Sequence, residues 1–173
     1  MLLENEKIKL RAIEPEDLDS FYKWENDTGT WLMGCTTAPY SRYQLKQYIA
    51  SSKDIYESKQ LRLMIEKKRI NRVVGMIDLY DFEPFHRRAA IGIIIDGSYR
   101  QKGVAAEALT LLCEYAFSFL KLHQLYAFIQ GGNEASVRLF KRCNFKMRGL
   151  LPDWVQNGDD YDNVLLFSLI SHP

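Results

Sequence analysis

The chain has 173 residues, a formal net charge of +1 and 47% hydrophobic residues. This length is typical of one domain, and the apolar content is enough to fill one core. A net charge near zero argues against nucleic acid as a partner, because nucleic-acid binding needs a strong basic excess. No signal segment opens the chain, and no apolar run approaches the ~20 residues that cross a bilayer. We therefore expect a single cytoplasmic domain over residues 1–173 with no membrane partner.

The cysteines and histidines are scattered along the chain, without the spacing of a metal site. They are Cys35, Cys113, Cys143, His86, His123 and His172. We expect reduced thiols and no bound metal.

The N-terminal half predicts one strand, then two helices, then two further strands. Residues 7–11 alternate polar and apolar, as in a strand with one buried face. Residues 14–18 carry acids and a proline, which is typical of the first turn of a helix. A second helix is predicted over 41–58, and strands over 61–66 and 72–79.

The centre of the chain predicts an anion-binding turn. Residues 89–95 are a β-branched apolar run, which indicates a buried strand, and an alanine-rich helix follows soon after. The start of such a helix offers free backbone N–H groups and a partial positive charge. Arg100 and Lys102 add full charges, and Gly103 lets a ligand approach the backbone. A diphosphate fits this turn, whose residues are Arg100, Gln101, Lys102, Gly103, Val104, Ala105 and Ala106.

The C-terminal half predicts a strand over 125–130 and a helix over 133–143 that is capped by Asn133. Asn144 stands where the helix would end in the left-handed conformation. Asn157 and Gly158 predict a two-residue hairpin turn before a strand over 162–169. The predicted order is β-α-α-β-β-β-α-β-α-β-β.

Two motifs resemble a known family. The spacing of nucleoside-triphosphate loops and of dinucleotide fingerprints is absent. Instead, Arg100-x-x-Gly103-x-Ala105 resembles the Arg/Gln-x-x-Gly-x-Gly/Ala signature of the GNAT N-acetyltransferase superfamily. Residues 133–145 resemble the Asn-x-x-Ser-x-x-Leu-x-x-x-x-Gly-Phe segment that follows it in that superfamily. The resemblance implies an α/β fold with a mixed, twisted central β-sheet flanked by helices.

The resemblance also implies acetyl-CoA as the co-substrate and an acetyl transfer to a primary amine. The basic turn would hold the pyrophosphate. Two neighbouring strands would splay apart, and the pantetheine arm would pair with the backbone of Ile93, Ile94 and Ile95. Asn133 and Phe140 would complete the coenzyme site.

The catalytic groups depart from the pattern of the superfamily. Phe140 stands where relatives carry a tyrosine that protonates the thiolate, and Ala90 stands where many carry a glutamate base. Asp78 and Asp81 are our candidates for the base, since a desolvated carboxylate can accept a proton. The alternative is that they are surface acids that neutralise nearby arginines. Other groups that could transfer a proton are His86, Tyr80 and Tyr99.

The acceptor stays open between two branches that the chain resembles. The acids at 78–83 resemble spermidine N-acetyltransferases, which take a polyamine. The phenylalanine at 140 fits ribosomal-protein alanine N-acetyltransferases, which take a protein N-terminus. The segment 31–40, which would cover the acceptor pocket, contains no acids and suits a less charged amine.

Two further readings stay open. The chain could be a catalytically weak relative that senses acetyl-CoA, or an acyltransferase for a hydroxyl or an aminoglycoside. Many relatives pair through their final strands, so a homo-oligomer is possible.

Overall fold

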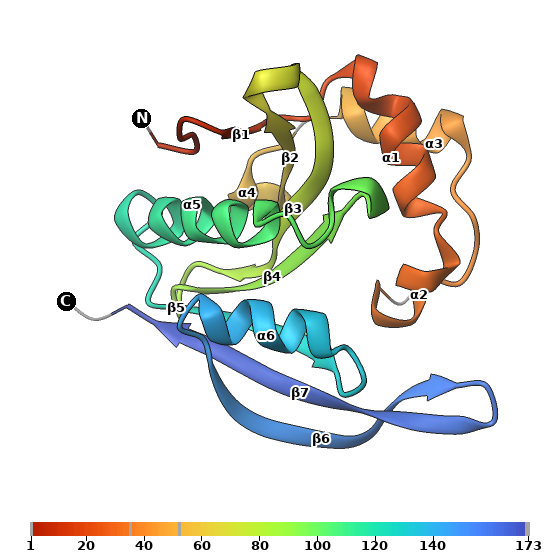
Figure 1. The fold of residues 1–173 in the computed structure, drawn as a ribbon, viewed down its shortest axis with the longest axis vertical. Helices are drawn as coiled ribbons and strands as arrows, with labels where there is room; N and C mark the ends of the chain where they lie inside the picture. The colour runs from red at the N-terminus through yellow and green to blue at the C-terminus, as the bar shows by residue number, and fades with distance from the viewer. Residues whose placement is uncertain (1, 35, 52, 172–173) are drawn as a thin grey trace.

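The protein is built around one mixed sheet of seven strands, in the order β1-β2-β3-β4-β5-β7-β6 (Figure 1). The computed structural model describes residues 2–34, 36–51 and 53–171. The strands are β1 (Ile8–Arg11), β2 (Leu61–Lys67), β3 (Arg72–Glu83), β4 (Arg88–Ile95), β5 (Gln124–Gln130), β6 (Lys146–Asn157) and β7 (Asp160–Ile170). The α-helices are α1 (Leu18–Glu25), α2 (Thr28–Gly34), α3 (Arg42–Ala50), α4 (Ile55–Ser58), α5 (Val104–Ser118) and α6 (Glu134–Arg142).

Helices cover both faces of the sheet. On one face, α5 and α6 pack on Ile77, Ile91 and Phe167 in the main core. On the other face, α1 and α3 pack on Met64 and Met76 in a smaller core. The expected α/β fold with a mixed sheet between helices is confirmed.

Strands β4 and β5 are parallel and pair over a short stretch only. The pairs are Arg88↔Gln124, Ala89↔Leu125 and Ala90↔Tyr126. Both strands continue beyond that point, β4 to Ile95 and β5 to Gln130. Because their pairing stops at Ala90, the edge of β4 that faces β5 is open to another partner from Ile91 onward.

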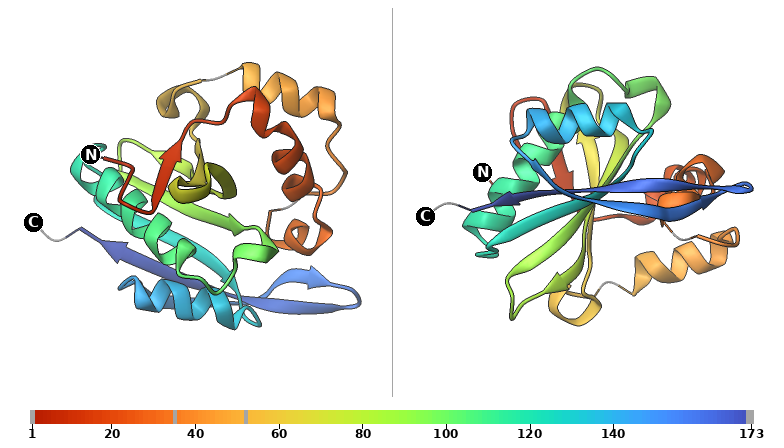
Figure 2. Two further views of the ribbon diagram at one scale, coloured as in Figure 1. Left: turned by 45° about the horizontal axis from the view of Figure 1, so that its top comes forward. Right: turned by 90° about the horizontal axis from the view of Figure 1, so that it is seen from below.

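Strands β6 and β7 form a long hairpin that extends beyond the body of the protein (Figures 1 and 2). The predicted turn is displaced by one residue, since Asn157 still pairs with Asp160. Gly158 begins the two-residue loop with φ +67°, which a glycine adopts without strain.

The predicted elements differ from the structure mainly in the helices. The helix predicted over 41–58 is two helices, because the Asp54 side chain accepts the N–H groups of Tyr56 and Glu57 and starts α4 anew. Helix α2 extends to Gly34 and so includes the first residues of the segment 31–40, which joins the two helices predicted in the N-terminal half. Strand β3 continues past residue 79 through a bulge and ends at Glu83.

Candidate active site

A wedge between β4 and β5 forms the first part of the site. Beyond Ala90, Ile93, Ile94 and Ile95 pair only with β3, through Ile77, Met76 and Gly75. Ile94 and Ile95 also line a hollow of about 280 Å³ between the end of β4 and α1. Peptide groups on an open strand edge can pair with an extended ligand that carries amides. The structure therefore brings Ile93–Ile95 to an edge of the expected kind.

A tight turn joins the end of β4 to the start of α5 and forms the second part. The Lys102 ammonium donates to the carbonyl of Ser98 at 2.7 Å, and Arg100 Nε donates to the carbonyl of Ile95 at 3.0 Å. Gly103 caps α5 with φ +80°, and nothing lies within 4 Å of the position that a Cβ would take there. The first N–H groups of the 15-residue helix have no carbonyl within the helix to bind. Residues 100–106 thus carry the elements of an anion site.

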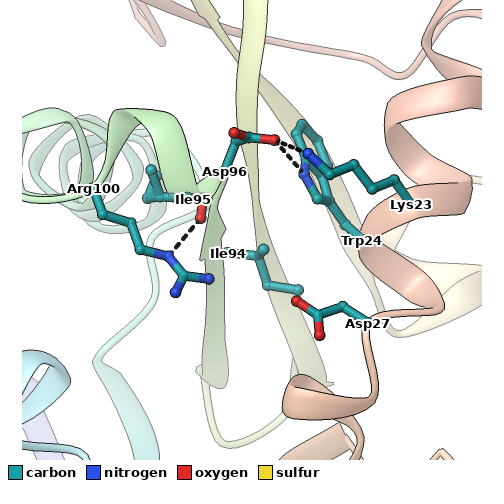
Figure 3. Close-up of a pocket in the computed structure, with 8 residues that line it drawn as sticks. Lys23, Trp24, Asp27, Ile94, Ile95, Asp96 and Arg100 are labelled. Atoms are coloured by element: carbon teal, nitrogen blue, oxygen red, sulfur yellow. Dashed lines mark hydrogen bonds and ion pairs between the residues drawn. The ribbon is translucent and has the colours of Figure 1, made fainter.

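The side chain of Asp96 ties this turn to α1 (Figure 3). Its Oδ2 accepts from Lys23 Nζ at 2.7 Å and from Trp24 Nε1 at 3.2 Å, and its Oδ1 accepts from the Ser98 N–H at 3.1 Å. These hydrogen bonds, first of all that of Lys23, hold the pKa of Asp96 well below its ordinary range despite partial burial. The guanidinium of Arg100 lies across the hollow from Asp27 (Figure 3). The carboxylate of Asp96 therefore holds the turn that joins β4 to α5 against α1.

Asp78 lies in a network of charged side chains on the face covered by α1 and α3. Arg62 Nη2 lies 2.6 Å from Asp78 Oδ2, and Arg62 Nη1 lies 2.7 Å from Glu25 Oε1. The three side chains are only 13–15% exposed. Burial raises the pKa of Glu25, although Arg62 opposes that rise. The carboxylate of Asp78 is thus the ion-pair partner of Arg62, and it is not open to solvent as the surface alternative required.

Asp81 lies at the bulge of β3, with φ +47° and an exposed side chain. It contributes, after burial, to the raised pKa of Tyr126 on β5, which Arg88 opposes. The structure does not bring Asp78 and Asp81 together. Asp78 points into the α1 face, and Asp81 lies at the far end of β3.

The two residues predicted to complete the coenzyme site, one at the start of α6 and one within it, have different surroundings. Asn133 caps the helix, and its side chain accepts the Ser136 N–H at 3.1 Å, as predicted. Phe140 is 3% exposed and packs edge-on against Phe145 with ring centroids 5.0 Å apart. Burial of this apolar ring stabilises the fold. Phe140 is therefore a core residue and does not line an open surface. Asn144 has φ +67°, the left-handed conformation expected at the end of this helix.

Sequence reasoning missed the residues that α1 and β2 contribute. Lys23 and Trp24 are far from the two motifs in sequence and reach Asp96 through the packing of α1 on the sheet. The same packing brings Glu25 of α1 to Arg62 of β2. Arg62 shares a face of β2 with the apolar Met64 two residues later, which was the available signal that this charged side chain points into a covered face.

The sequence also led to expectations about metal ligands, membrane-spanning segments and cysteines. In the part of the chain that the structure describes, no group of three or more His, Cys, Asp and Glu side chains is placed to hold a metal ion. Within the same residues, no helix has the length and apolar character needed to cross a membrane. Cys113 is buried and Cys143 half-buried, both as free thiols, while Cys35 and His172 lie outside the described residues.

Comparison with known proteins agrees with this geometry. Residues 7–146 match the acetyltransferase (GNAT) domain family. The spermidine N(1)-acetyltransferase of Escherichia coli (strain K12) is 27% identical over 169 residues, which cover 95% of this chain and 87% of that protein. The ribosomal-protein-serine acetyltransferase of the same organism is 22% identical over 175 residues, with 96% and 94% covered.

Solved structures of the spermidine N-acetyltransferase from Vibrio cholerae share the fold. The complex with CoA and spermine has a TM-score of 0.85 at 24% identity, with 96% of each chain covered. A dodecameric structure in an intermediate state has a TM-score of 0.80 at 25% identity, with 96% of this chain and 95% of that chain covered.

The chain therefore belongs to the GNAT acetyltransferase family and is an N-acetyltransferase. The resemblance drawn from the two sequence motifs is confirmed, and so is acetyl-CoA as the acetyl donor that the family uses.

Proposed function

We propose that the turn at residues 100–106 binds the diphosphate of acetyl-CoA and that the pantetheine arm extends into the wedge along Ile93–Ile95. The observation that carries this proposal is the end of β4–β5 pairing at Ala90. The unpaired part of β4 leads into the turn with two basic residues at which α5 begins. Anions bind favourably at such helix starts, and an open strand edge supplies the amide partners.

The same proposal assigns roles to the remaining residues. The backbone of Gln101, Gly103 and Val104 to Ala106 would cradle phosphate oxygens, with the charges of Arg100 and Lys102 beside them. Asn133, exposed at the start of α6, lies where it could meet the nucleotide end. Phe140 would act through the core beneath α6, since its ring is covered.

For the acceptor we propose a small cationic amine, with a polyamine as the first candidate. Glu25 and Asp78 share a single arginine, so the network has one more carboxylate than cation if both acids are ionised. Asp27 adds an exposed carboxylate at the hollow. This excess of acid attracts a cation. The spermidine acetyltransferases among the relatives support the same choice, while a protein N-terminus is the alternative.

The test is thiol release from acetyl-CoA with a panel of acceptors. The panel contains spermidine, spermine, peptides that begin with Ala or Ser, lysine peptides and aminoglycosides. We expect release with the polyamines above the rate without acceptor. Release only with peptides would move the acceptor to the protein N-terminus. Silence across the panel with acetyl-CoA still bound would favour a sensor.

We also propose that the protein forms a homo-oligomer through its final hairpin. Strand β6 is an edge strand of 12 residues, and such edges are open to pairing. Met147, Leu150 and Trp154 on β6 are 51–61% exposed, and Tyr161 on β7 is 56% exposed. Analytical ultracentrifugation should therefore find more than a monomer, and Trp154→Lys should shift the protein toward the monomer. A wild-type monomer at all concentrations would refute this.

A further inference from the structure

Acetyl transfer to an amine needs a group that donates a proton to the thiolate or accepts one from the amine. The two positions at which relatives carry such a group, 90 and 140, are apolar in this chain. Ala90 carries a methyl group, and Phe140 cannot donate a proton. We propose that Tyr80 on β3 is the proton-transfer residue of this site. The inference deepens the proposed function and rests on it.

The strand register places Tyr80 on β3, across β4 from the wedge, and the position of its ring brings it over β4. Tyr80 pairs with Ala90, and Asp78 pairs with Gly92 in the next row of the same face. A Cβ built on Gly92 would lie 3.6 Å from Cε1 and 3.9 Å from Cδ1 of Tyr80. The ring of Tyr80 therefore leans along β4 from Ala90 toward Gly92, which is the direction in which the wedge opens.

Small residues on β4 make room for this ring. Gly92 has no side chain, and Ala90 is 0% exposed although it carries only a methyl group. Its register partners on the two sides are Tyr80 and Tyr126, whose side chains share its face. A glutamate at position 90 would have to displace these rings. The absence of a glutamate at position 90 therefore leaves the space over Ala90 and Gly92 that the ring of Tyr80 occupies.

Other titratable groups lie near Ala90 and Gly92 on the neighbouring strands. Asp78 is paired with Arg62, and Asp81 is exposed at the bulge. Tyr126 is on the far side of Ala90, where it interacts with Arg88. Tyr80 is half-buried on the face of the hollow and of α1. The charged and titratable groups on this side of the sheet and on the helices packed against it are Glu25 on α1, Tyr48 on α3, Arg62 on β2, Asp78 and Asp81 on β3, Arg88 on β4 and Tyr126 on β5.

The proposed step balances as follows. The neutral acceptor amine attacks the thioester carbonyl carbon, a C–N bond forms, and the C–S bond of acetyl-CoA breaks. The phenol of Tyr80 gives its proton to the leaving thiolate, which departs as free CoA thiol. The nitrogen of the new amide gives its excess proton back to the phenolate. One proton thus moves from nitrogen to sulfur, and no other reactant is consumed.

The test compares Tyr80→Phe with Tyr126→Phe. Both variants lose one phenol hydroxyl and keep the ring next to Ala90. General acid–base groups contribute about 10²–10⁴-fold to turnover. We expect Tyr80→Phe to lower kcat by about 100-fold or more, with unchanged acetyl-CoA affinity. Tyr126→Phe should turn over at close to the wild-type rate, because it removes a hydroxyl that takes no part in the proposed proton transfer.

A second measurement separates proton transfer from packing. A fluorinated tyrosine incorporated at position 80 keeps the ring but loses its proton at lower pH. The alkaline limb of the kcat profile should move to lower pH with it. An unmoved limb, or a Tyr80→Phe variant as active as the wild type, would overturn the role of Tyr80 and leave the proposed function standing. A wild-type protein that releases no thiol with any amine would overturn both.

Discussion

Arg62 on β2 grips Asp78 on β3 with two parallel interactions, from Nε to Oδ1 at 3.0 Å and from Nη2 to Oδ2 at 2.6 Å. Its remaining Nη1 binds Glu25 on α1. Burial favours the neutral form of Arg62, but pairing with Asp78 outweighs it and raises the pKa of Arg62. One arginine therefore joins two strands and a helix on the face of the sheet that α1 and α3 cover.

Arg62→Gln should destabilise the fold strongly. It leaves two largely buried carboxylates without their cation, and breaking a buried pair in this way costs about 3–5 kcal/mol. Urea denaturation measures the change in the free energy of unfolding. Arg42→Gln is the matched control, because Arg42 pairs with Asp19 on the surface, where ion pairs contribute about 0–1 kcal/mol. Equal losses in the two variants would contradict the account.

Asp96→Asn should destabilise the protein in a pH-dependent way. The pKa of Asp96 is lower in the folded state than its ordinary value of 3.8. Its contribution is therefore fully present above the pKa of the unfolded state and is lost as the pH falls through the lower folded pKa. At pH 7 we expect a loss of about 1.5–3 kcal/mol, typical of hydrogen bonds to a charged group. Thermal unfolding should show this difference shrinking below about pH 4. A difference that is the same at pH 3 and pH 7 would contradict the assignment.

Gly103→Val should abolish measurable acetyl-CoA binding, or weaken it by at least about tenfold, a difference of about 1.4 kcal/mol. The branched side chain would stand where the diphosphate must approach the backbone. Gly158→Val is the control, since both glycines have positive φ and open space around a Cβ. Both variants should suffer similar backbone strain, so only the loss of binding, measured by calorimetry, is specific to position 103. Wild-type affinity in Gly103→Val would refute the cradle.

Phe140→Tyr should not restore a lost catalytic acid. The ring lies in the core, so the added hydroxyl would be buried, and an unsatisfied hydroxyl costs about 1–3 kcal/mol. We expect lower thermal stability and no gain in kcat. A variant with faster turnover would show that the ring of residue 140 reaches the thiolate and would weaken the case for Tyr80.

The sequence predicted the local features well because they are encoded locally. The β-branched run at 89–95, Gly103 before a helix, and the caps Asn133 and Asn144 each act through neighbouring residues. The new start at Asp54 was equally local, yet the apolar pattern of 41–58 concealed it.

The acceptor side could not be derived in the same way. The Arg62 network and the contact between Tyr80 and Gly92 depend on strand register and on helix packing over long sequence separations. The sequence left Asp78 open between a catalytic base and a surface acid, because nothing near it in sequence predicts that Arg62 pairs with it on the neighbouring strand.

The most direct test of the central claim is a crystal structure of the protein with bound CoA. We predict the diphosphate on the N–H groups of residues 101–106 and the pantetheine amides paired with β4 beyond Ala90. CoA bound elsewhere, or β4 and β5 paired along their full length with no wedge between them, would contradict the account.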